Sequence, residues 1–599
     1  MSSKHVRSLV GPALILLAAA LATAPILLHG SFCGDDFEFH VVSWFDIQQS
    51  WRYGIPFPHW MPSANYGAGE PRFMFYPPLT SMLGAALGFV LQWHLVPIAM
   101  VFLFLAGTGL AVRALARESL PDAPATLAGC TALFSGFALF TAYERTAFAE
   151  LTGGFWIPLL LHFALRDSNP SAGVLRRALD GSTLPLALLF AGAWLSNGPV
   201  GVMANYLIAA TALTACVLVR SWAPLLRASI AAALGIALPA FYLIPAAWEQ
   251  KWADLRAAVD YPVFNIRNNW LFARHSDPSF APFDAVNHRA SLLAVYMIGV
   301  ALVGVLVSFL RGRLAQRGRL DGMPHLKTRR RWIPLALIPL VVLFLQFPIS
   351  LPLWNLLPKL RFLQYPWRWV LVVEAPMAIF FAAAIWPSRS SKDWQRIAIA
   401  FLCAIAFLTS TAFAAKAFLR TCNEGDTVAD LLAQYRAGGG LEGTDEYEPP
   451  DSDHWKIAAM LPDACLSADP DTKLGAAAAG ESIPTWRAAQ GSCDATATAQ
   501  LRQPERLRIS TTATHAGYLI LRLVRYPAWR IKVNGRVTDQ IDTRDDGLIA
   551  VPVPQGAVEV TADWVATRDV IAGRCLSFLG LLLLIVLGLF ERRRPAPQL

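Results

Sequence analysis

Long apolar runs that alternate with short cationic clusters are the feature that most limits how this chain can fold. The first run, residues 9–28, carries no charge and is long enough to cross a hydrocarbon core of roughly 30 Å as a helix. Lys4 and Arg7 precede it, and the preference of Lys and Arg for the cytoplasmic side places the end of this helix outside. A cleaved signal peptide is the alternative interpretation. The many later runs favour an uncleaved first span.

The whole pattern predicts a polytopic α-helical membrane protein of about twelve spans. Every cationic loop then falls on one side, and the loop at residues 311–331, with the strongest cationic bias, assigns that side to the cytoplasm. The last run ends at Arg592, Arg593 and Arg594, so both termini are expected in the cytoplasm. The expected spans are residues 9–28, 95–112, 126–142, 151–165, 184–195, 202–219, 230–246, 291–310, 333–349, 370–386, 397–415 and 570–590.

Composition supports the membrane interpretation. Of 599 residues, 55% are hydrophobic and 16% are charged, which is too apolar for a soluble chain. The net charge of +9 would suit nucleic acid, but the Lys and Arg residues lie between apolar runs, as membrane orientation requires. Membrane lipid is therefore an expected partner and nucleic acid is not. The eight cysteines include no C-x-x-C pair, so no zinc ribbon or redox motif is indicated.

A long first outer loop, residues 30–78, opens with the acidic stretch Gly34-Asp35-Asp36-Phe37-Glu38-Phe39-His40. Aromatic and apolar residues recur at intervals of three and four over residues 37–51, which predicts an amphipathic helix lying in the membrane interface. Residues 53–78 are dense in Pro, Gly and aromatic residues, as in an ordered loop. Residues 79–91 are apolar but short, and predict a re-entrant or interfacial helix. Residues 1–415 are expected to form one transmembrane domain.

Residues 416–569 have a different composition and are expected to form an extracytoplasmic, mainly β domain. Alternating apolar residues at 519–523, 531–533, 549–553 and 558–564 predict strands, and Asn534-Gly535 predicts a hairpin turn. A small antiparallel β-sandwich is the expected fold, followed at residues 570–599 by the last span and a basic tail. Cys422, Cys465 and Cys493 would meet an oxidising compartment, where a Cys465–Cys493 bridge is expected.

Charged residues that follow the apolar runs gather on the predicted outer side. Carboxylates there are suited to act as general base for a hydroxyl or to hold a divalent cation, and Arg matches phosphate oxygens. A site of this composition at the lipid boundary suits a lipid-linked phosphosugar, and charges so near a bilayer are functional candidates by default. The candidates are Asp35, Asp36, Glu38 and His40 in the first loop, Glu144, Arg145 and Glu150 in the second, and Arg361 and Arg368 in a later one.

Simpler roles exist for most of these residues. Asp35 is also suited to cap the following helix, which would leave Asp36 as the chemical residue. His40 is suited to packing in the interface, and Glu144 and Arg145 to pairing with each other. Arg361 and Arg368 are suited to reaching lipid headgroups. Glu38 is expected to be solvated or interfacial.

Several short motifs resemble a known family. They are Gly34-Asp35-Asp36, Tyr76-Pro77-Pro78-Leu79, a second loop of the form Tyr143-x-Arg145-x-x-x-x-Glu150, Arg361-Phe362-Leu363-Gln364-Tyr365-Pro366-Trp367-Arg368 and Tyr526-Pro527-Ala528-Trp529. With the many spans and the outer β domain, they resemble the GT-C superfamily of membrane glycosyltransferases. More narrowly, they resemble bacterial membrane proteins labelled 6-pyruvoyl-tetrahydropterin-synthase-related, although nothing in the chain looks like the soluble pterin enzyme.

The resemblance implies transfer of a sugar from a polyprenyl-phosphate carrier to an outer acceptor, which is a glycan, lipid or protein, with inversion at the anomeric carbon. Asp36 or Asp35 would be the base, and Glu144 or Glu150, with His40, would assist or bind the acceptor. Arg145, Arg361 or Arg368 would offset charge on the leaving polyprenyl phosphate. No second Asp-x-Asp occurs in the second loop, so dependence on Mg²⁺ or Mn²⁺, with Asp36 and His40 as ligands, stays open.

Two other functions fit parts of the pattern. A transporter or flippase of lipid-linked sugars would carry charges inside its spans and internal repeats, but the sequence has few such charges and no clear repeat. A noncatalytic envelope-glycan assembly protein would tolerate replacement of Asp35, Asp36 and Glu150. In every case the expected location is the bacterial inner membrane. The sequence does not choose between sugars or acceptors.

Overall fold

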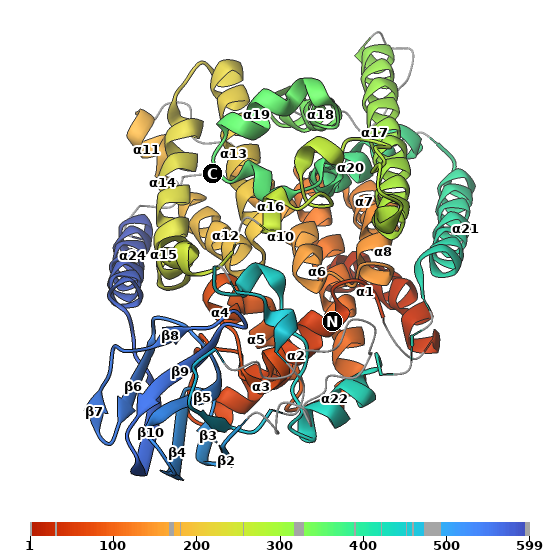
Figure 1. The fold of residues 1–599 in the computed structure, drawn as a ribbon. Helices are drawn as coiled ribbons and strands as arrows, with labels where there is room; N and C mark the ends of the chain where they lie inside the picture. The colour runs from red at the N-terminus through yellow and green to blue at the C-terminus, as the bar shows by residue number, and fades with distance from the viewer. Residues whose placement is uncertain are drawn as a thin grey trace.

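The computed structural model describes residues 3–29, 33–166, 173–179, 181–254, 257–316, 329–388, 391–420, 422–423, 425–450, 452–457, 461–471 and 493–592. Apolar helices fill one part of the molecule, and the strands form a separate lobe below them (Figure 1). The short helices of the first loop lie between the two. This arrangement is a multi-pass helical membrane domain with a C-terminal antiparallel β domain, as the sequence predicts.

Within the described residues, eight helical segments are long and apolar enough to cross a membrane, or up to ten if each of two bent helix pairs counts as one span. The bent pairs are α14 (Ala223–Ala237) with α15 (Ala240–Trp248), and α18 (Arg329–Leu345) with α19 (Leu351–Leu356). The eight segments contain α1 (Ser3–His29), α6 (Val96–Arg117), α7 (Asp122–Leu133) with α8 (Gly136–Tyr143), α13 (Gly198–Val219), α17 (Ala281–Gln316), η7 (Pro366–Val373) with α20 (Glu374–Ile385), α21 (Asp393–Phe418) and α24 (Arg568–Arg592).

Two of the twelve expected spans do not reach this length. Residues 151–165 belong to the short helices α9 (Phe148–Leu151) and α10 (Gly153–Ala164), and residues 184–195 to α12 (Thr183–Ser196). At 1.5 Å per residue, a helix of 14 residues is about 21 Å long, which is shorter than the hydrocarbon core. Apolar composition alone therefore overestimated the number of full spans.

The first loop folds into α2 (Phe37–Arg52), α3 (Ala64–Gly67) and α4 (Arg72–Phe75), and the short apolar run after it forms α5 (Pro78–Leu87). Helix α2 is the predicted amphipathic helix, and its expected position in the membrane interface stays a prediction. Eleven of its residues are buried and they occupy most of its circumference, because protein covers it on several sides. Trp44, for example, is fully buried and packs against α5 at Gly84.

The C-terminal β domain is the predicted sandwich. Its two sheets have the strand orders β2-β1-β5-β9-β8 and β3-β4-β10-β6-β7, and all pairs are antiparallel. Asn534 and Gly535 both have positive φ in the β6–β7 hairpin, as its tight turn requires. The strands are β1 (Ala464–Ser467), β2 (Ala495–Ala497), β3 (Ala499–Gln503), β4 (Arg506–Ala513), β5 (Gly517–Val524), β6 (Trp529–Val533), β7 (Arg536–Val537), β8 (Asp542–Thr543), β9 (Leu548–Val553) and β10 (Gly556–Trp564).

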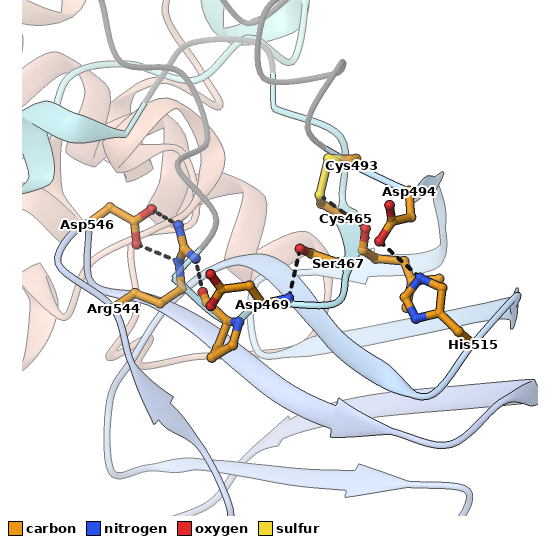
Figure 2. Close-up of a disulfide and its surroundings, with 10 residues drawn as sticks. Cys465, Ser467, Asp469, Cys493, Asp494, His515, Arg544 and Asp546 are labelled. Atoms are coloured by element: carbon orange, nitrogen blue, oxygen red, sulfur yellow. Dashed lines mark hydrogen bonds and ion pairs between the residues drawn. A yellow bond between two sulfur atoms is a disulfide. The ribbon is translucent and has the colours of Figure 1, made fainter.

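Two disulfides tie this part of the chain. The expected Cys465–Cys493 bond is confirmed, and Figure 2 shows it at the start of β1 near the ion pair of His515 with Asp494. A second bond joins Cys33 of the first loop to Cys422, whose Cα atoms are 5.2 Å apart. The sequence did not predict this pair, which lies 389 residues apart.

The β domain rests on the first loop. Trp60 belongs to the core of the β domain and lies 5.3 Å, ring to ring, from Trp529. The backbone N–H of Val524 donates to the carbonyl of Ala68 at 2.9 Å. The linker before the domain contains α22 (Val428–Arg436), and it packs along α2. The first loop is thus enclosed by the helix bundle, the linker and the β domain.

Candidate functional site

The acidic stretch is held against the second loop by backbone contacts. The N–H of Asp36 donates to the carbonyl of Arg145 at 3.0 Å. A side chain at Gly34 would collide with the carbonyl oxygen of Glu144, so glycine permits this close approach. Asp36 is the residue before α2, and its side chain makes no capping hydrogen bond. Asp35 is not the cap either, so the capping interpretation of this stretch is wrong.

Four predicted residues meet in what we call the Asp36 cluster: Asp36, Arg145, Glu150 and Arg368. Arg145 Nη1 donates to Glu150 Oε2 at 2.7 Å, and its Nη2 lies 3.8 Å from Asp36 Oδ2. Arg368 Nε lies 3.6 Å from the same Glu150 oxygen. Among the described residues, Glu150 Oε1 and Arg368 Nε have no hydrogen-bond partner. The cluster therefore alternates in charge and contains two buried polar atoms that have no hydrogen-bond partner among the described residues.

Local structure places these side chains. After α8 ends at Tyr143, Thr146 adopts a positive φ of 47°, which turns the chain sharply into α9. That turn directs Arg145 across the face of Trp367, 5.1 Å from its ring centroid. Arg368 follows Trp367 at the start of η7, and its Nη1 donates to the Gln364 side chain at 3.0 Å. The motif at residues 361–368 thus supplies both the ring and the second guanidinium.

The electrostatic setting of Asp36 favours a carboxyl that exchanges protons. Its side chain is 44% accessible, and the desolvation of its partly buried carboxyl raises its pKa above the ordinary value. The guanidinium groups of Arg145 and Arg368 lower the pKa, and the carboxylates of Asp35 and Glu150 raise it. Glu150, in contrast, is buried. Asp36 is the more accessible carboxylate of the cluster.

Three further side chains adjoin the Asp36 cluster. Burial first, and then the Asp36 carboxylate, raise the pKa of Tyr76 from the Tyr-Pro-Pro-Leu motif. The pKa of Tyr365 is raised to about 12, mainly by burial, with Asp36 raising it and Arg368 lowering it. The pKa of Glu446, in the linker, is raised to about 7, first by burial and then by Asp36, while Arg368 lowers it. All three side chains are half-buried. They extend the cluster into an acidic and aromatic surface.

A second group, the Glu144 cluster, consists of Asp35, Glu144, Arg289 and Arg420. Glu144, which is 1% exposed, accepts from Arg289 Nε at 2.9 Å and from Arg420 Nη2 at 2.9 Å. Arg420 Nη1 also donates to Asp35 Oδ1 at 3.2 Å. The expected pairing of Glu144 with Arg145 is therefore wrong, since each has other partners. This cluster fixes the first loop to α17 and to the chain after α21.

His40 lies on α2, one turn after Asp36, among aromatic rings. Its ring centroid is 5.3 Å from that of Phe148 and 6.0 Å from that of Tyr76. Burial first, and then the charges of Arg72 and Arg145, lower its pKa to about 3. The imidazole is neutral at any physiological pH. Within the described residues no group of three or more His, Cys, Asp and Glu side chains is placed to hold a metal ion, so Asp36 and His40 lack a third ligand of these types there.

The two remaining candidates lie outside both clusters. Arg361 is exposed, and its Nε donates to Asn355 Oδ1 at 3.1 Å. Glu38 is exposed, and its pKa is raised first by desolvation and then by the charge of Glu442. Neither contacts Asp36.

Sequence reasoning missed Arg289, Arg420 and Glu446 as site residues. Arg289 and Arg420 each stand within a few residues of the end of an apolar run on the predicted outer side. The same criterion that selected Arg368 would have selected them. Glu446 lies in an acidic part of the linker and carries no such signal.

Comparisons with known proteins identify distant structural likenesses only. No protein-family model matches the chain. No curated protein matches it either. The narrower pterin-synthase-related resemblance thus stays a prediction.

Among solved structures, the oligosaccharyltransferase of Archaeoglobus fulgidus in the apo form aligns with 74% of this chain at 14% identity and a TM-score of 0.41. The mycobacterial arabinofuranosyltransferase AftD aligns with 95% of this chain at 15% identity and a TM-score of 0.41. ArnT from Cupriavidus metallidurans bound to undecaprenyl phosphate aligns with 83% of this chain at 12% identity and a TM-score of 0.29. The alignments cover 61%, 40% and 97% of those chains. With scores below 0.5, these likenesses do not assign an activity.

Proposed function

We propose that this protein is an integral-membrane glycosyltransferase that moves a sugar from a polyprenyl-phosphate donor to an extracytoplasmic acceptor, with inversion at the anomeric carbon. The observation that carries the proposal is the Asp36 cluster. A half-accessible carboxylate of raised pKa lies beside two guanidinium groups at one end of an apolar helix bundle. This combination supplies a base and a phosphate-binding group at the depth where a lipid-linked sugar phosphate lies.

In the proposed reaction Asp36 accepts the proton of an acceptor hydroxyl. The hydroxyl oxygen forms a bond to the anomeric carbon from the face opposite the phosphate. The bond between that carbon and the phosphate oxygen breaks, and its electron pair leaves with the polyprenyl phosphate. Arg368 and Arg145 stabilise the charge that develops on the phosphate. A raised pKa suits this role, because a base works best when its pKa lies near the operating pH.

The other charged residues have positioning roles in this proposal. Glu150 is buried between the two guanidinium groups and holds them in place. Glu144, Arg289 and Arg420 fix the loop that carries Asp36, and Asp35 is occupied by Arg420. The proposal therefore assigns the base to Asp36 and not to Asp35. Glu446 and Tyr76 are placed to contact the acceptor.

The test is transfer of radiolabelled sugar by purified protein from a panel of polyprenyl-phosphate sugars to a mixture of envelope glycans and lipids. With Asp36→Asn, turnover should fall about 10²- to 10⁴-fold, the usual loss for a general base. Asp35→Asn, the matched neighbour, should keep most of its turnover, because it loses only an ion pair with Arg420. Equal turnover in wild type and Asp36→Asn would refute the assignment. Donor that crosses liposomes without any transfer would indicate a flippase instead.

A further inference from the structure

A cavity of about 270 Å³ lies between α2 and α22, away from both charged clusters. Gln48, in its wall, is twelve residues beyond Asp36, which is about 18 Å along the axis of α2. The walls of the cavity carry the guanidinium groups of Arg52 and Arg436, the amides of Gln48 and Gln49, and the rings of Trp93 and Tyr435. The proposed transfer reaction uses none of these residues.

The charge in this cavity is not neutralised by its walls. Arg52 Nη2 donates to the neutral Gln48 Oε1 at 3.0 Å, and its guanidinium lies 6.0 Å from the Phe89 ring centroid. Arg436 makes no side-chain hydrogen bond or ion pair within the described part of the chain. Of the described residues that line the cavity, none is acidic. Asp46 is fully buried and accepts from the Tyr435 hydroxyl at 2.9 Å, so it lies behind that ring.

The cavity also adjoins one end of a candidate span. Trp93 in its wall begins the candidate span Trp93–Arg117. Just before it, Phe89 and Val90 are 54% and 77% exposed, and Trp51 of α2 stacks on Phe89 at 6.1 Å. Exposed apolar residues next to tryptophan at the end of a span are typical of the boundary between headgroups and acyl chains.

We propose that this cavity binds a phosphate ester at the membrane surface. The two guanidinium groups pair with the phosphate oxygens, as Arg does in charge-assisted hydrogen bonds. The amide of Gln49 lines the same cavity and is placed for a hydroxyl group of a polyol attached to that phosphate, and the Tyr435 oxygen, whose proton is donated to Asp46, can accept from a second one. The same chemistry is offered by an anionic phospholipid headgroup and by a soluble phosphate ester, and the experiment separates these two sources.

The experiment measures equilibrium binding of radiolabelled dioleoyl-phosphatidylglycerol to the purified full-length protein in detergent. We expect saturable binding to wild type. Arg52→Gln and Arg436→Gln should each weaken it about 5-fold, which corresponds to ~1 kcal/mol per arginine near an anionic membrane surface. The control is Arg536→Gln, an exposed arginine on β7 of the β domain, which should bind as wild type does. Thermal unfolding of each variant verifies that it is folded.

Glycerol 3-phosphate distinguishes the two sources. Displacement of the lipid by this soluble ester at millimolar concentration would show that the phosphate group is the recognised part. Saturable lipid binding that resists displacement and depends on both arginines would identify the phospholipid headgroup as the ligand. The proposal is overturned by absence of saturable binding to wild type, or by equal affinity in wild type and the Arg52→Gln, Arg436→Gln double variant. This binding experiment does not measure sugar transfer. Its result would therefore stand even if the protein transferred no sugar.

Discussion

Asp36 takes its chemical character from the charges that face it. Desolvation raises its pKa, and the guanidinium groups of Arg145 and Arg368 oppose that rise. The base in the proposed reaction must be ionised, so activity should fall as the pH drops through the pKa of Asp36. That fall should occur at higher pH than for an ordinary aspartate.

Replacing Arg368 should shift the pH at which activity falls on the acidic side of the pH profile. Because the Arg368 charge lowers the pKa of Asp36, Arg368→Gln should raise that pKa and shift the limb of the kcat/KM profile to higher pH. It should also reduce kcat, because the leaving phosphate loses a partner. The matched control is Arg361→Gln, seven residues earlier and outside the cluster. A limb at the same pH in Arg368→Gln and wild type would mean that Asp36 is not the titrating base.

Asp46 should make stability depend on pH. It is fully buried and accepts hydrogen bonds from Ser63 and Tyr435, and burial raises its pKa to about 6. In the unfolded chain its pKa is about 3.9, so the native state binds the proton more tightly. Protonation should therefore add stability as the pH falls from about 7 to 4, by at most ~3 kcal/mol.

The measurement is the thermal midpoint of wild type and Asp46→Asn at pH 7.5, 6 and 4.5 in detergent. The uncharged variant lacks this proton site, so the midpoint of wild type should rise relative to that of the variant as the pH falls. A constant difference across this range would contradict the raised pKa.

Sequence reasoning found most of the charged residues at the site but not their partners. Proximity to the ends of apolar runs identified Asp36, Arg145, Glu150 and Arg368. Sequence adjacency suggested a Glu144–Arg145 pair. In the structure Glu144 pairs instead with Arg289 and Arg420, which are far from it in the sequence. Such pairing depends on which spans lie side by side, and hydropathy carries no information on that packing.

At the scale of elements, the Cys33–Cys422 bond joins the first loop to the start of the linker. It lies close in sequence to Asp35 and Arg420, which form an ion pair. Replacing both cysteines by serine should lower the free energy of unfolding by ~2–4 kcal/mol, the usual contribution of a disulfide. It should also reduce turnover, because the loop that carries Asp36 loses a tether.

Thermal unfolding and sugar transfer measure the two effects. Cys130→Ser is the control, because Cys130 is a free cysteine of the helix bundle. If the Cys33→Ser, Cys422→Ser double variant unfolds and turns over as the control does, the bond has no role in holding the loop.

The elements themselves differed in how well the sequence predicted them. The strands of the β domain were predicted because period-two alternation and Asn-Gly turns are local signals. Helix α2 was predicted as a helix, but the sequence did not predict how far protein covers it. Its apolar face indicates an apolar neighbour, and lipid and protein satisfy that pattern equally well.

In the whole molecule, the β domain and the first loop share one core. Trp60 packs against Tyr526, Trp529 and Trp564 and is 1% exposed. Trp60→Ala should cost ~3–5 kcal/mol, as for other large buried side chains. It should also raise the amide hydrogen exchange rate both in residues 53–78 and in β6 and β10.

The control for this prediction is Trp455→Ala, because Trp455 is 65% exposed in the linker. Its exchange rates should match those of wild type. Faster exchange in the β domain alone after Trp60→Ala would show that the first loop keeps its structure without this contact.

The Cys33–Cys422 bond also sets an order for biogenesis. Cys33 follows the first span, so it leaves the ribosome early, while its partner is made 389 residues later. Until Cys422 has been made, Cys33 is either a thiol or in a bond with another cysteine that must later be exchanged. Closure of the correct bond is therefore a late event, after nearly every span has been synthesised. A thiol-trapping reagent added during translation would report, at this one residue, whether the chain has completed its assembly.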